Sequence, residues 1–266
     1  MLKTIKYNLH THTSRCRHAK GSDREYVETA IAEGFDVLGF SDHCPQIFPE
    51  KDFYSTFRMF PEQAAEYAES VRALQKEYES DIKILLGFEA EYYPLTFDAL
   101  RELIAPLHLD YMIMGQHFVG NEYDEDSFYT SNCQRGDRFL TRYITQVMEG
   151  LETGMFTYIA HPDIVNYQGR DAFYYREMGA LCRYCRDKKI PLEFNMLGYV
   201  NSRNYPDPRF WKIAAATGNQ VVLGYDAHTP VMLRRYDVYE ACLALLNGLN
   251  IKPMNYEEII FRNEVL

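Results

Sequence analysis

The amino-acid sequence predicts an α/β fold in which seven strand-helix units close into a barrel. Short apolar runs alternate along the chain with longer amphipathic segments, and this pattern requires a parallel sheet with right-handed crossovers. An open doubly wound sheet would normally carry a glycine-rich phosphate turn after its first strand, whereas residues 10–12 read His-Thr-His. We therefore expect a closed barrel and one domain over residues 1–266, because no repeat or linker interrupts the chain.

Seven short apolar runs are expected to form the strands. They are Ile5–Leu9, Val37–Ser41, Ile82–Phe88, Tyr111–Gly115, Thr157–Ala160, Pro191–Asn195 and Val221–Tyr225. Four of the segments between them carry helix-start signals. These signals are Ser22-Asp23 with Glu25 as a capping box, Pro61 at a first helical position, Asp137 and Pro230.

Composition excludes several classes of protein. With 47% hydrophobic and 25% charged residues the chain is globular, and its net charge of −10 disfavours a nucleic-acid partner. The sequence shows neither a signal-peptide apolar region nor a membrane-length apolar run, so we expect a cytoplasmic protein without a membrane partner. The six cysteines are expected to be free thiols, including Cys182 and Cys185 within a helical pattern. The oligomeric state stays open.

The histidines fall at the ends of the predicted strands. His10 and His12 end the first strand, and His43, His117, His161 and His228 end the second, fourth, fifth and seventh, while Glu89 ends the third. In a parallel barrel these ends meet at one face, where reactive groups converge. Residues two apart on a strand share a face, so His10 with His12, Glu89 with Glu91, and Asp226 with His228 can each grip one ion. His108 fits no strand end.

A glycine lies two positions before three of these polar residues. Gly87, Gly115 and Gly224 precede Glu89, His117 and Asp226, and we expect the missing side chains to leave room for ions and their ligands. The whole pattern predicts a metal site at the carboxyl ends of the strands.

The motifs resemble those of the PHP family, named for polymerase and histidinol phosphatase. In chain order they are His10-x-His12, His18, Asp42-His43, Gly87-Phe88-Glu89, His117, His161-Pro162-Asp163 and Asp226-Ala227-His228. Within the family, HTHTSRCRH, FSDHCPQIFP and Arg58-Met59 are most similar to the monofunctional histidinol-phosphate phosphatases. The segment that follows Asn195 keeps only a loose likeness to the substrate loop of those enzymes.

The resemblance implies a distorted (β/α)7 barrel, similar to a TIM barrel, with three divalent metal ions at its C-terminal face. By position, His10, His12, Glu89 and Asp226 would hold the first ion. Glu89 would bridge to a second ion held by His117 and His161. A third ion would be held by His18, His43 and His228. Imidazole and carboxylate ligands suit zinc, iron or manganese alike.

Such a centre predicts a phosphomonoesterase acting on a small molecule, and the resemblance implies that this molecule is histidinol phosphate. A metal-bound hydroxide would attack the phosphorus directly while the ions neutralise the phosphoryl oxygens. Asp42, Asp163 and a metal-bound water are the candidate proton donors, and Asp42 has the alternative role of orienting a ligand imidazole. Arg203 and Arg170 are candidate phosphate ligands, and Glu91 is a candidate anion for the substrate amine.

Two alternative functions stay open. The first is a PHP phosphoesterase with another small phosphomonoester or phosphotyrosine as substrate. The second, more remote, is a metal-dependent amidohydrolase, which generally needs a carboxylated lysine or a glutamate at the fourth strand, where this chain has His117. His18 and the Asp42-His43 pair also favour the phosphatase-type site.

Overall fold

A seven-stranded parallel sheet forms the centre of the computed structural model, which describes residues 6–50 and 53–262. In spatial order its strands are β1 (Tyr7–Asn8), β2 (Val37–His43), β3 (Lys83–Ala90), β4 (Tyr111–Met114), β7 (Tyr158–Ile159), β8 (Leu192–Asn195) and β9 (Val221–Gly224). Each neighbouring pair is parallel. The predicted strands are all present, although Ile5, at the start of the first, lies outside the described residues.

The sheet curves until its first and last strands meet, which gives a nearly closed barrel and confirms the predicted fold class. β1 and β9 make contact just beyond their ends, where His12 N donates to Ala227 O and Ala227 N donates to His10 O, both at 3.0 Å. Next to this bridge, β1 and β9 are joined by a side chain in place of backbone pairing. The Asn8 Oδ1 atom accepts a hydrogen bond from Tyr225 N at 3.1 Å. The barrel is therefore distorted at one seam.

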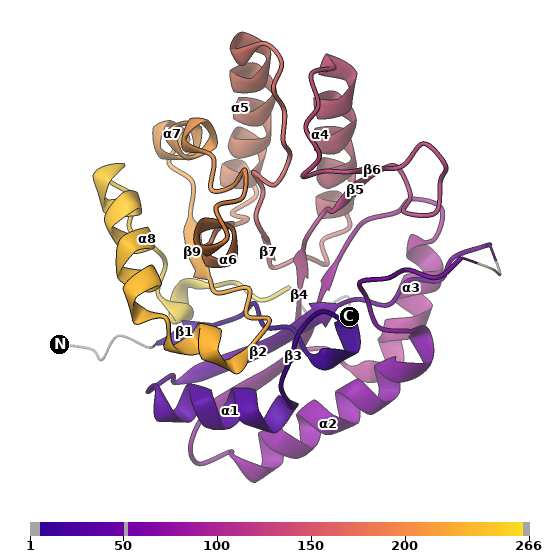
Figure 1. The fold of residues 1–266 in the computed structure, drawn as a ribbon, viewed down its shortest axis with the longest axis vertical. Coiled ribbons are helices and arrows are strands. Elements are labelled where there is room, and N and C mark those ends of the chain that lie inside the picture. The colour runs from indigo at the N-terminus through magenta and orange to yellow at the C-terminus, as the bar shows by residue number, and fades with distance from the viewer. Residues whose placement is uncertain (1–5, 51–52, 263–266) are drawn as a thin grey trace.

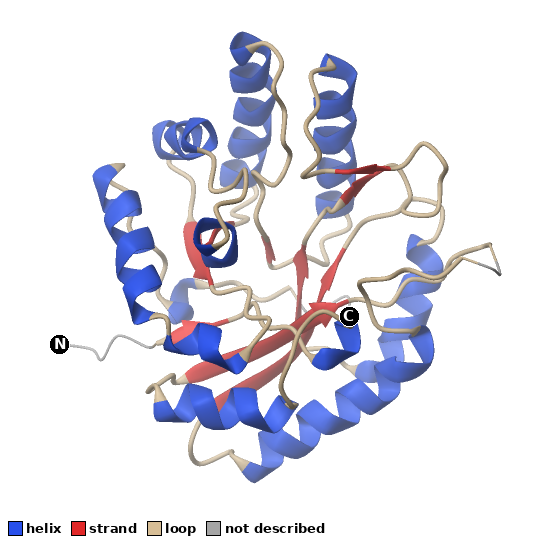
Figure 2. Ribbon diagram, in the orientation of Figure 1, coloured by secondary structure: helices blue, strands red, loops and turns tan. Residues whose placement is uncertain are grey.

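Helices surround the sheet in chain order (Figure 1), and Figure 2 shows them outside the strands, except for the short α6, which lies inside the ring of helices. They are α1 (Asp23–Ala32), α2 (Ala64–Glu77), α3 (Phe97–Ile104), α4 (Asp137–Glu152), α5 (Asp171–Asp187), α6 (Met196–Val200), α7 (Pro208–Thr217) and α8 (Tyr236–Gly248). No helix in the described part of the chain is both long and apolar enough to cross a bilayer.

The predicted helix starts agree with the structure, with one refinement. Ser22 caps α1 in a capping box with Glu25, and Asp137 begins α4. Pro61 and Pro230 instead begin short 3-10 helices that precede α2 and α8. Proline fits there because the first turn needs no backbone donor at that position.

Two small elements were not predicted from the sequence. The hairpin of β5 (Phe118–Val119) and β6 (Phe128–Tyr129) follows β4, and the short helix α6 follows β8. Two-residue strands show no usable hydrophobic periodicity, and a helix of five residues spans little more than one turn. Both elements lie in segments that follow the C-terminal ends of strands.

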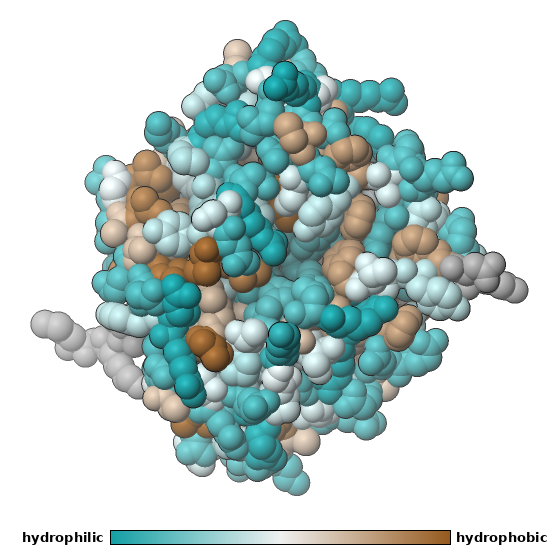
Figure 3. All heavy atoms as spheres, viewed as in Figure 1, coloured by the Kyte–Doolittle hydropathy of each residue, from teal (hydrophilic) through white to brown (hydrophobic). Residues whose placement is uncertain are grey.

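The floor of the barrel is apolar. One buried cluster joins residues from five strands to the segment 254–259: Leu9, Val37, Leu85, Tyr111, Ile113, Tyr158, Ala160, Val222, Met254 and Ile259. Because alternate residues on a strand share a face, Leu85 lies on the face of Glu89, and Val222 lies on that of Asp226. The inward-facing residues are thus apolar below and polar at the carboxyl ends. On the outside, the face seen in Figure 3 is mainly hydrophilic, with hydrophobic side chains in small separate patches.

Candidate metal centre

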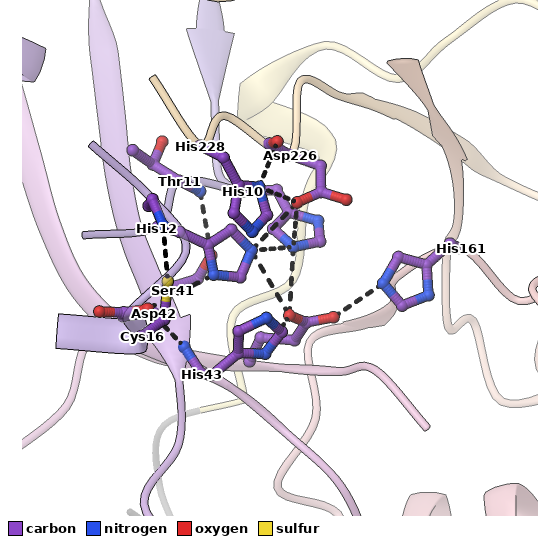
Figure 4. Close-up of polar contacts among 12 residues, drawn as sticks. His10, Thr11, His12, Cys16, Ser41, Asp42, His43, His161, Asp226 and His228 are labelled. Atoms are coloured by element: carbon purple, nitrogen blue, oxygen red, sulfur yellow. Dashed lines mark hydrogen bonds and ion pairs between the residues drawn. The ribbon is translucent and has the colours of Figure 1, made fainter. Parts of the chain in front are cut away.

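All the histidines except His108 come together at the C-terminal end of the barrel with one glutamate and one aspartate. We call this set the histidine–carboxylate cluster: His10, His12, His18, His43, Glu89, His117, His161, Asp226 and His228. Figure 4 shows rings from the first, second and last strand ends directed toward one another, with His161 on the opposite side. Most of these side chains are buried, and His18 and His228 are the more exposed members.

Glu89, near the end of β3, lies in the middle of the histidines. Its Oε1 is 2.8 Å from His161 Nε2 and 3.6 Å from His117 Nε2. Its Oε2 is 3.0 Å from His43 Nδ1 and 3.5 Å from the Nε2 atoms of both His10 and His12. The two oxygens therefore face different groups of imidazoles, which is the arrangement a bridging ligand requires.

Asp226 follows β9 and faces the same centre from the other side of the barrel. Its Oδ1 is 3.0 Å from His12 Nε2, 3.2 Å from His228 Nδ1 and 3.5 Å from His10 Nε2. Asp226 adopts a φ of 50°, and His161 a φ of 32°. Positive φ is uncommon for residues other than glycine, although Asp and His are among those that tolerate it best, and such backbone strain concentrates at functional sites.

The second nitrogen of several imidazoles is held by an oxygen acceptor. His10 Nδ1 lies 2.8 Å from Glu193 Oε1, and His117 Nδ1 lies 2.9 Å from Glu91 Oε1. His18 Nδ1 lies 2.9 Å from a backbone carbonyl. These acceptors require a proton on Nδ1, so Nε2 is the nitrogen that each of these rings turns toward the cluster.

The cluster is short of hydrogen-bond donors at its centre. Both oxygens of Glu89 and Oδ1 of Asp226 are buried without a hydrogen-bond partner. The Nε2 atoms of His10 and His12 are 3.1 Å apart, and those of His18 and His228 are 2.9 Å apart. Lone pairs at this separation repel unless a proton or a cation lies between them.

Several subsets of the cluster have the spacing of metal ligands. The ligand atoms lie within 4.8 Å of one another in His10-His12-Glu89, in His12-His43-His228 and in His10-His161-Asp226. Imidazole nitrogen and carboxylate oxygen are the donors expected for zinc, iron or manganese. The unpartnered carboxylates and the convergent nitrogens fit divalent ions.

The carboxylates stay ionised in spite of their burial. Burial opposes ionisation of Glu89, but the imidazoles of His117 and His10 outweigh it and hold the pKa of Glu89 well below its usual range. The pKa of Asp226 is likewise lowered, because His10 and His12 outweigh the effect of burial. Both carboxylates are therefore charged, and each can attract protons or metal ions.

The imidazoles divide into two groups by protonation. Burial opposes protonation of His12, but its contacts with Asp226 and Asp42 raise the pKa to about 9. Burial and the neighbouring His228 lower the pKa of His18 to about 4. Some nitrogens are thus ready to bind metal near neutral pH, whereas others must first lose a proton.

The three glycines singled out in the sequence do make room, but side chains fill it. A Cβ at Gly115 would lie 1.9 Å from Glu89 Oε1, and one at Gly224 would lie 1.4 Å from Glu193 Oε1. At Gly87 the space is taken by the Tyr111 ring, 2.6 Å from such a Cβ. Only at Gly115 is the space taken by a side chain of the histidine–carboxylate cluster.

A cavity of about 570 Å³ opens onto the cluster. Its walls include Thr56, Phe57, Phe118, Tyr129, Leu197, Asn201, Arg203 and Tyr205. Phe118 and Tyr129 come from the β5–β6 hairpin, and Leu197 comes from α6. The elements that the sequence did not predict therefore form part of the cavity wall.

Among the predicted phosphate ligands, only Arg203 lines this cavity. Its Nη1 donates to the Tyr205 hydroxyl at 2.9 Å. Arg170 caps α5, is 75% exposed at its side chain and pairs with Asp137. Arg170 thus lies away from the cavity, with its guanidinium paired to a carboxylate on the surface.

The remaining predicted residues lie behind the cavity wall. Asp42 is fully buried and accepts from the Thr13 hydroxyl and from His43 N, with its Oδ1 3.4 Å from His12 Nδ1. Asp163 is buried and accepts from Asp207 N and Trp211 Nε1. Neither carboxylate lines the cavity.

Glu91 also differs from its expected role. It is fully buried and lies between Arg58 and His117, so it is not open to a substrate amine. The sequence signal that placed it on the face of Glu89 was correct, since its carboxylate reaches the imidazole of His117. What spacing could not show is that the carboxylate is paired with a buried arginine and does not line the cavity.

Glu193 is a residue of the site that the sequence analysis did not identify. Its carboxylate lies against His10 Nδ1 and also accepts from His161 N at 3.1 Å. The available signal was a charged residue inside the apolar run of the predicted sixth strand, which is rarely tolerated unless the charge is paired.

A parallel barrel that gathers imidazoles and carboxylates at one end beside a cavity is typical of metal-dependent hydrolases. Comparison with protein families identifies which of these it is. A model described as the PHP domain matches residues 8–196. The chain belongs to the PHP domain family.

Known proteins similar to this chain include several histidinol-phosphatases. A Deinococcus radiodurans protein named "Probable histidinol-phosphatase" is 31% identical over 228 residues, which cover 83% of this chain and 85% of that protein. The Bacillus subtilis "Histidinol-phosphatase" is 23% identical over 84% of this chain and 93% of its own length. A crystal structure of histidinol phosphate phosphatase from Lactococcus lactis, complexed with zinc, L-histidinol and phosphate, has a TM-score of 0.69 at 20% identity, covering 95% and 96% of the two chains. That likeness concerns the fold.

Proposed function

We propose that this protein is a metal-dependent phosphomonoesterase that hydrolyses L-histidinol phosphate to L-histidinol and phosphate. The observation that carries the proposal is the histidine–carboxylate cluster opening into a cavity beside an arginine, Arg203. The family and the names of the similar histidinol-phosphatases support the same reaction. A small phosphomonoester is the substrate class, and the net charge of −10 argues against a nucleic acid.

We propose that the cluster holds three divalent ions. His10, His12, Glu89 and Asp226 would hold one, Glu89 with His117 and His161 a second, and His18, His43 and His228 a third. Zinc in the Lactococcus lactis complex makes zinc the first metal to test. Bound there, the ions would neutralise charge on the phosphoryl oxygens and make water a better nucleophile near neutral pH.

The protein's own side chains would orient the substrate in the cavity. The Arg203 guanidinium can donate two parallel hydrogen bonds to phosphate oxygens, and such charge-assisted bonds fix both distance and angle. The rings of Phe57, Phe118, Tyr129 and Tyr205 give flat walls that suit an imidazole by stacking or edge contacts. A hydrogen bond from Arg203 holds the Tyr205 hydroxyl, which sets the relative position of one wall and the phosphate site.

The buried carboxylates support positioning roles. Asp42 Oδ1 near His12 Nδ1 would orient that imidazole, which is the alternative role expected for it from the sequence. Asp163 holds the chain at Asp207, just after Arg203 and Tyr205. We assign the two aspartates to orientation of the site because both lie behind the cavity wall.

The proposal is tested by assaying the metal-reconstituted protein against four substrates. They are histidinol phosphate, phosphotyrosine, a nucleoside monophosphate and a lactone. We expect phosphate release from histidinol phosphate with the highest kcat/KM. A higher kcat/KM for another phosphomonoester would replace the substrate and keep the reaction class. Lactone hydrolysis without phosphate release would overturn the phosphatase and favour an amidohydrolase.

A further inference from the structure

A buried arginine, Arg58, connects the histidine–carboxylate cluster to the wall of the cavity. Its side chain is 1% exposed, although the charged guanidinium is among the least readily buried groups in proteins. The guanidinium donates to Glu91, Glu122, Ser55 Oγ and the backbone carbonyl of Cys44. A charge buried this completely, with its donors paired on several sides, fixes the relative positions of the segments it contacts.

The contact with Glu91 reaches the metal centre. Arg58 Nη1 and Nη2 donate to the two oxygens of Glu91 at 2.7 and 2.9 Å. Glu91 Oε1 also lies 2.9 Å from His117 Nδ1. An ionised carboxylate can only accept hydrogen bonds, so Nδ1 of His117 carries a proton and Nε2 is the nitrogen that faces the cluster, 3.6 Å from Glu89 Oε1. The Arg58 guanidinium therefore holds the Glu91 carboxylate in place, and that carboxylate orients the His117 ring.

The contact with Glu122 reaches the cavity wall. Arg58 Nε and Nη2 lie 3.0 and 2.6 Å from Glu122 Oε2, and Nε also donates to Ser55 Oγ at 3.2 Å. Glu122 belongs to the connection between β5 and β6, the strands that carry Phe118 and Tyr129 into the wall. Through Nε and Nη2 the guanidinium therefore links Ser55, in the segment before α2, to Glu122 in the β5–β6 hairpin.

The Phe57 ring contacts both Arg58 and the histidine–carboxylate cluster. The Arg58 guanidinium carbon is 4.4 Å from the centre of the Phe57 ring. That ring in turn lies edge-on to His43 and His117, at centroid distances of 5.1 and 5.6 Å, and lines the cavity. A displacement of Arg58 would thus move both a cavity wall and the ring of a cluster histidine.

We propose that Arg58 is a positioning residue with two separable effects. Through Glu91 it holds His117 in the orientation that binds an ion, and through Glu122 and Phe57 it sets the wall against which substrate packs. The inference extends the proposed function, since the ion and the substrate are those of the proposed reaction. It predicts that metal affinity at His117 and the shape of the cavity both depend on this one side chain, each through a different carboxylate.

The two effects are tested at the carboxylates, because removing Arg58 itself would leave two buried carboxylates without their partner and endanger folding. Glu91→Gln presents its amide NH2 either to His117 or to Arg58. The first choice moves the imidazole proton to Nε2, and the second sets donor against donor. Glu122→Ala removes the wall contact and leaves Glu91 in place.

The experiment measures zinc content and zinc affinity by chelator competition, together with kcat and KM, at 25 °C and below the Tm of each variant. In Glu91→Gln we expect one zinc ion to bind about 10–100-fold more weakly, while the others bind as before. In Glu122→Ala we expect zinc affinity to change less than about 2-fold and KM to rise about 10-fold, since a charge-assisted contact holding the wall is lost. Arg58→Lys, which keeps the charge but loses the paired geometry, should show both effects.

Asp110→Asn serves as the matched control. Asp110 also pairs with an arginine, Arg72, but outside the cavity, so neither zinc affinity nor KM should change. Unchanged zinc affinity in folded Glu91→Gln, with an active wild-type enzyme, would overturn the inference while the proposed function stands. A wild-type enzyme inactive on histidinol phosphate, with zinc still weakened in Glu91→Gln, would overturn the proposed function alone. Zinc loss in both Glu91→Gln and Glu122→Ala would contradict the separation of the two effects.

Discussion

Gly224 and Glu193 approach so closely that a β-carbon on Gly224 would lie 1.4 Å from Glu193 Oε1. The same carboxylate oxygen lies 2.8 Å from Nδ1 of His10. The missing side chain on β9 therefore lets a carboxylate from β8 pass across the inner face of the sheet and reach a cluster histidine. Gly224 therefore affects the site indirectly, because it leaves room for the carboxylate that orients the His10 ring.

Replacing Gly224 with alanine should damage both stability and metal binding. The new methyl group must displace Glu193, and such overpacking typically costs about 1–3 kcal/mol of unfolding free energy. Displacement of Glu193 also releases His10, so zinc affinity should fall by about 10-fold or more. Urea unfolding and chelator competition measure the two effects.

Gly248→Ala is the control for that variant. Gly248 ends α8, and a β-carbon there would meet no other atom within 4 Å. Alanine should raise the unfolding free energy by about 0.4–1 kcal/mol, because it restricts the unfolded chain. Equal stability of Gly224→Ala and wild type would contradict the close approach seen between residues 224 and 193.

Much of the fold follows from the sequence because its signals are local. The seven apolar runs predicted the strands. Because His10, His43, His117 and His228 fall at the strand ends, and these ends meet at one face of a parallel barrel, the gathering of the histidines could be predicted as well. Strand ends differed by one or two residues, as is usual where pairing stops.

The rest of the site depends on contacts between distant segments. Arg58 and Glu91 meet across 33 residues, and His10 and Glu193 across 183. Glu91 and Arg170 both looked available to substrate from their positions after strand ends. Each is held by an oppositely charged side chain that spacing along the chain cannot identify.

Variants of Asp163 distinguish between two roles for this residue, proton donation and positioning. Its Oδ2 accepts from Asp207 N and Trp211 Nε1, and burial raises its pKa to about 7. If Asp163 positions the segment that carries Arg203, Asp163→Asn should keep kcat within about 3-fold, because an amide oxygen can still accept. Loss of a proton donor would instead lower kcat by about 10²–10⁴-fold.

Asp163→Ala completes that comparison. Without an acceptor at residue 163, the segment at Asp207 loses its anchor, and KM should rise while zinc content stays at the wild-type level. Steady-state kinetics of both variants, with zinc content measured on the same samples, separate the two roles. An equal loss of kcat in Asp163→Asn and Asp163→Ala would instead identify Asp163 as the proton donor.

Zinc affinity should increase with pH. Contacts with Asp226 and Asp42 overcome burial and raise the pKa of His12 to about 9, and Glu193 and Asp226 similarly raise that of His10. Below pH 9 His12 is therefore protonated in the metal-free protein, and zinc must displace that proton. Each proton released makes the apparent affinity rise about tenfold per pH unit until the pH passes the pKa.

Calorimetry in buffers of different ionisation enthalpy measures this exchange. We expect net proton release on zinc binding at pH 7, and less release as the pH passes 9. Zinc binding at pH 7 without proton release would show that the cluster is already deprotonated and would contradict the raised pKa of His12.

Arg203 and Arg170 looked alike in the sequence and should behave differently. Arg203 lines the cavity with its guanidinium held by the Tyr205 hydroxyl, whereas the exposed Arg170 pairs with Asp137. If Arg203 binds phosphate, Arg203→Met should lower kcat/KM by about 10–100-fold and weaken inhibition by inorganic phosphate to a similar extent, since a hydrogen bond to a charged group contributes about 1.5–3 kcal/mol. Arg203→Lys should recover only part of this loss, because an ammonium group cannot form two parallel bonds. Arg170→Met should leave both quantities within about 2-fold, and a larger effect there than at Arg203 would reverse the assignment of the phosphate site.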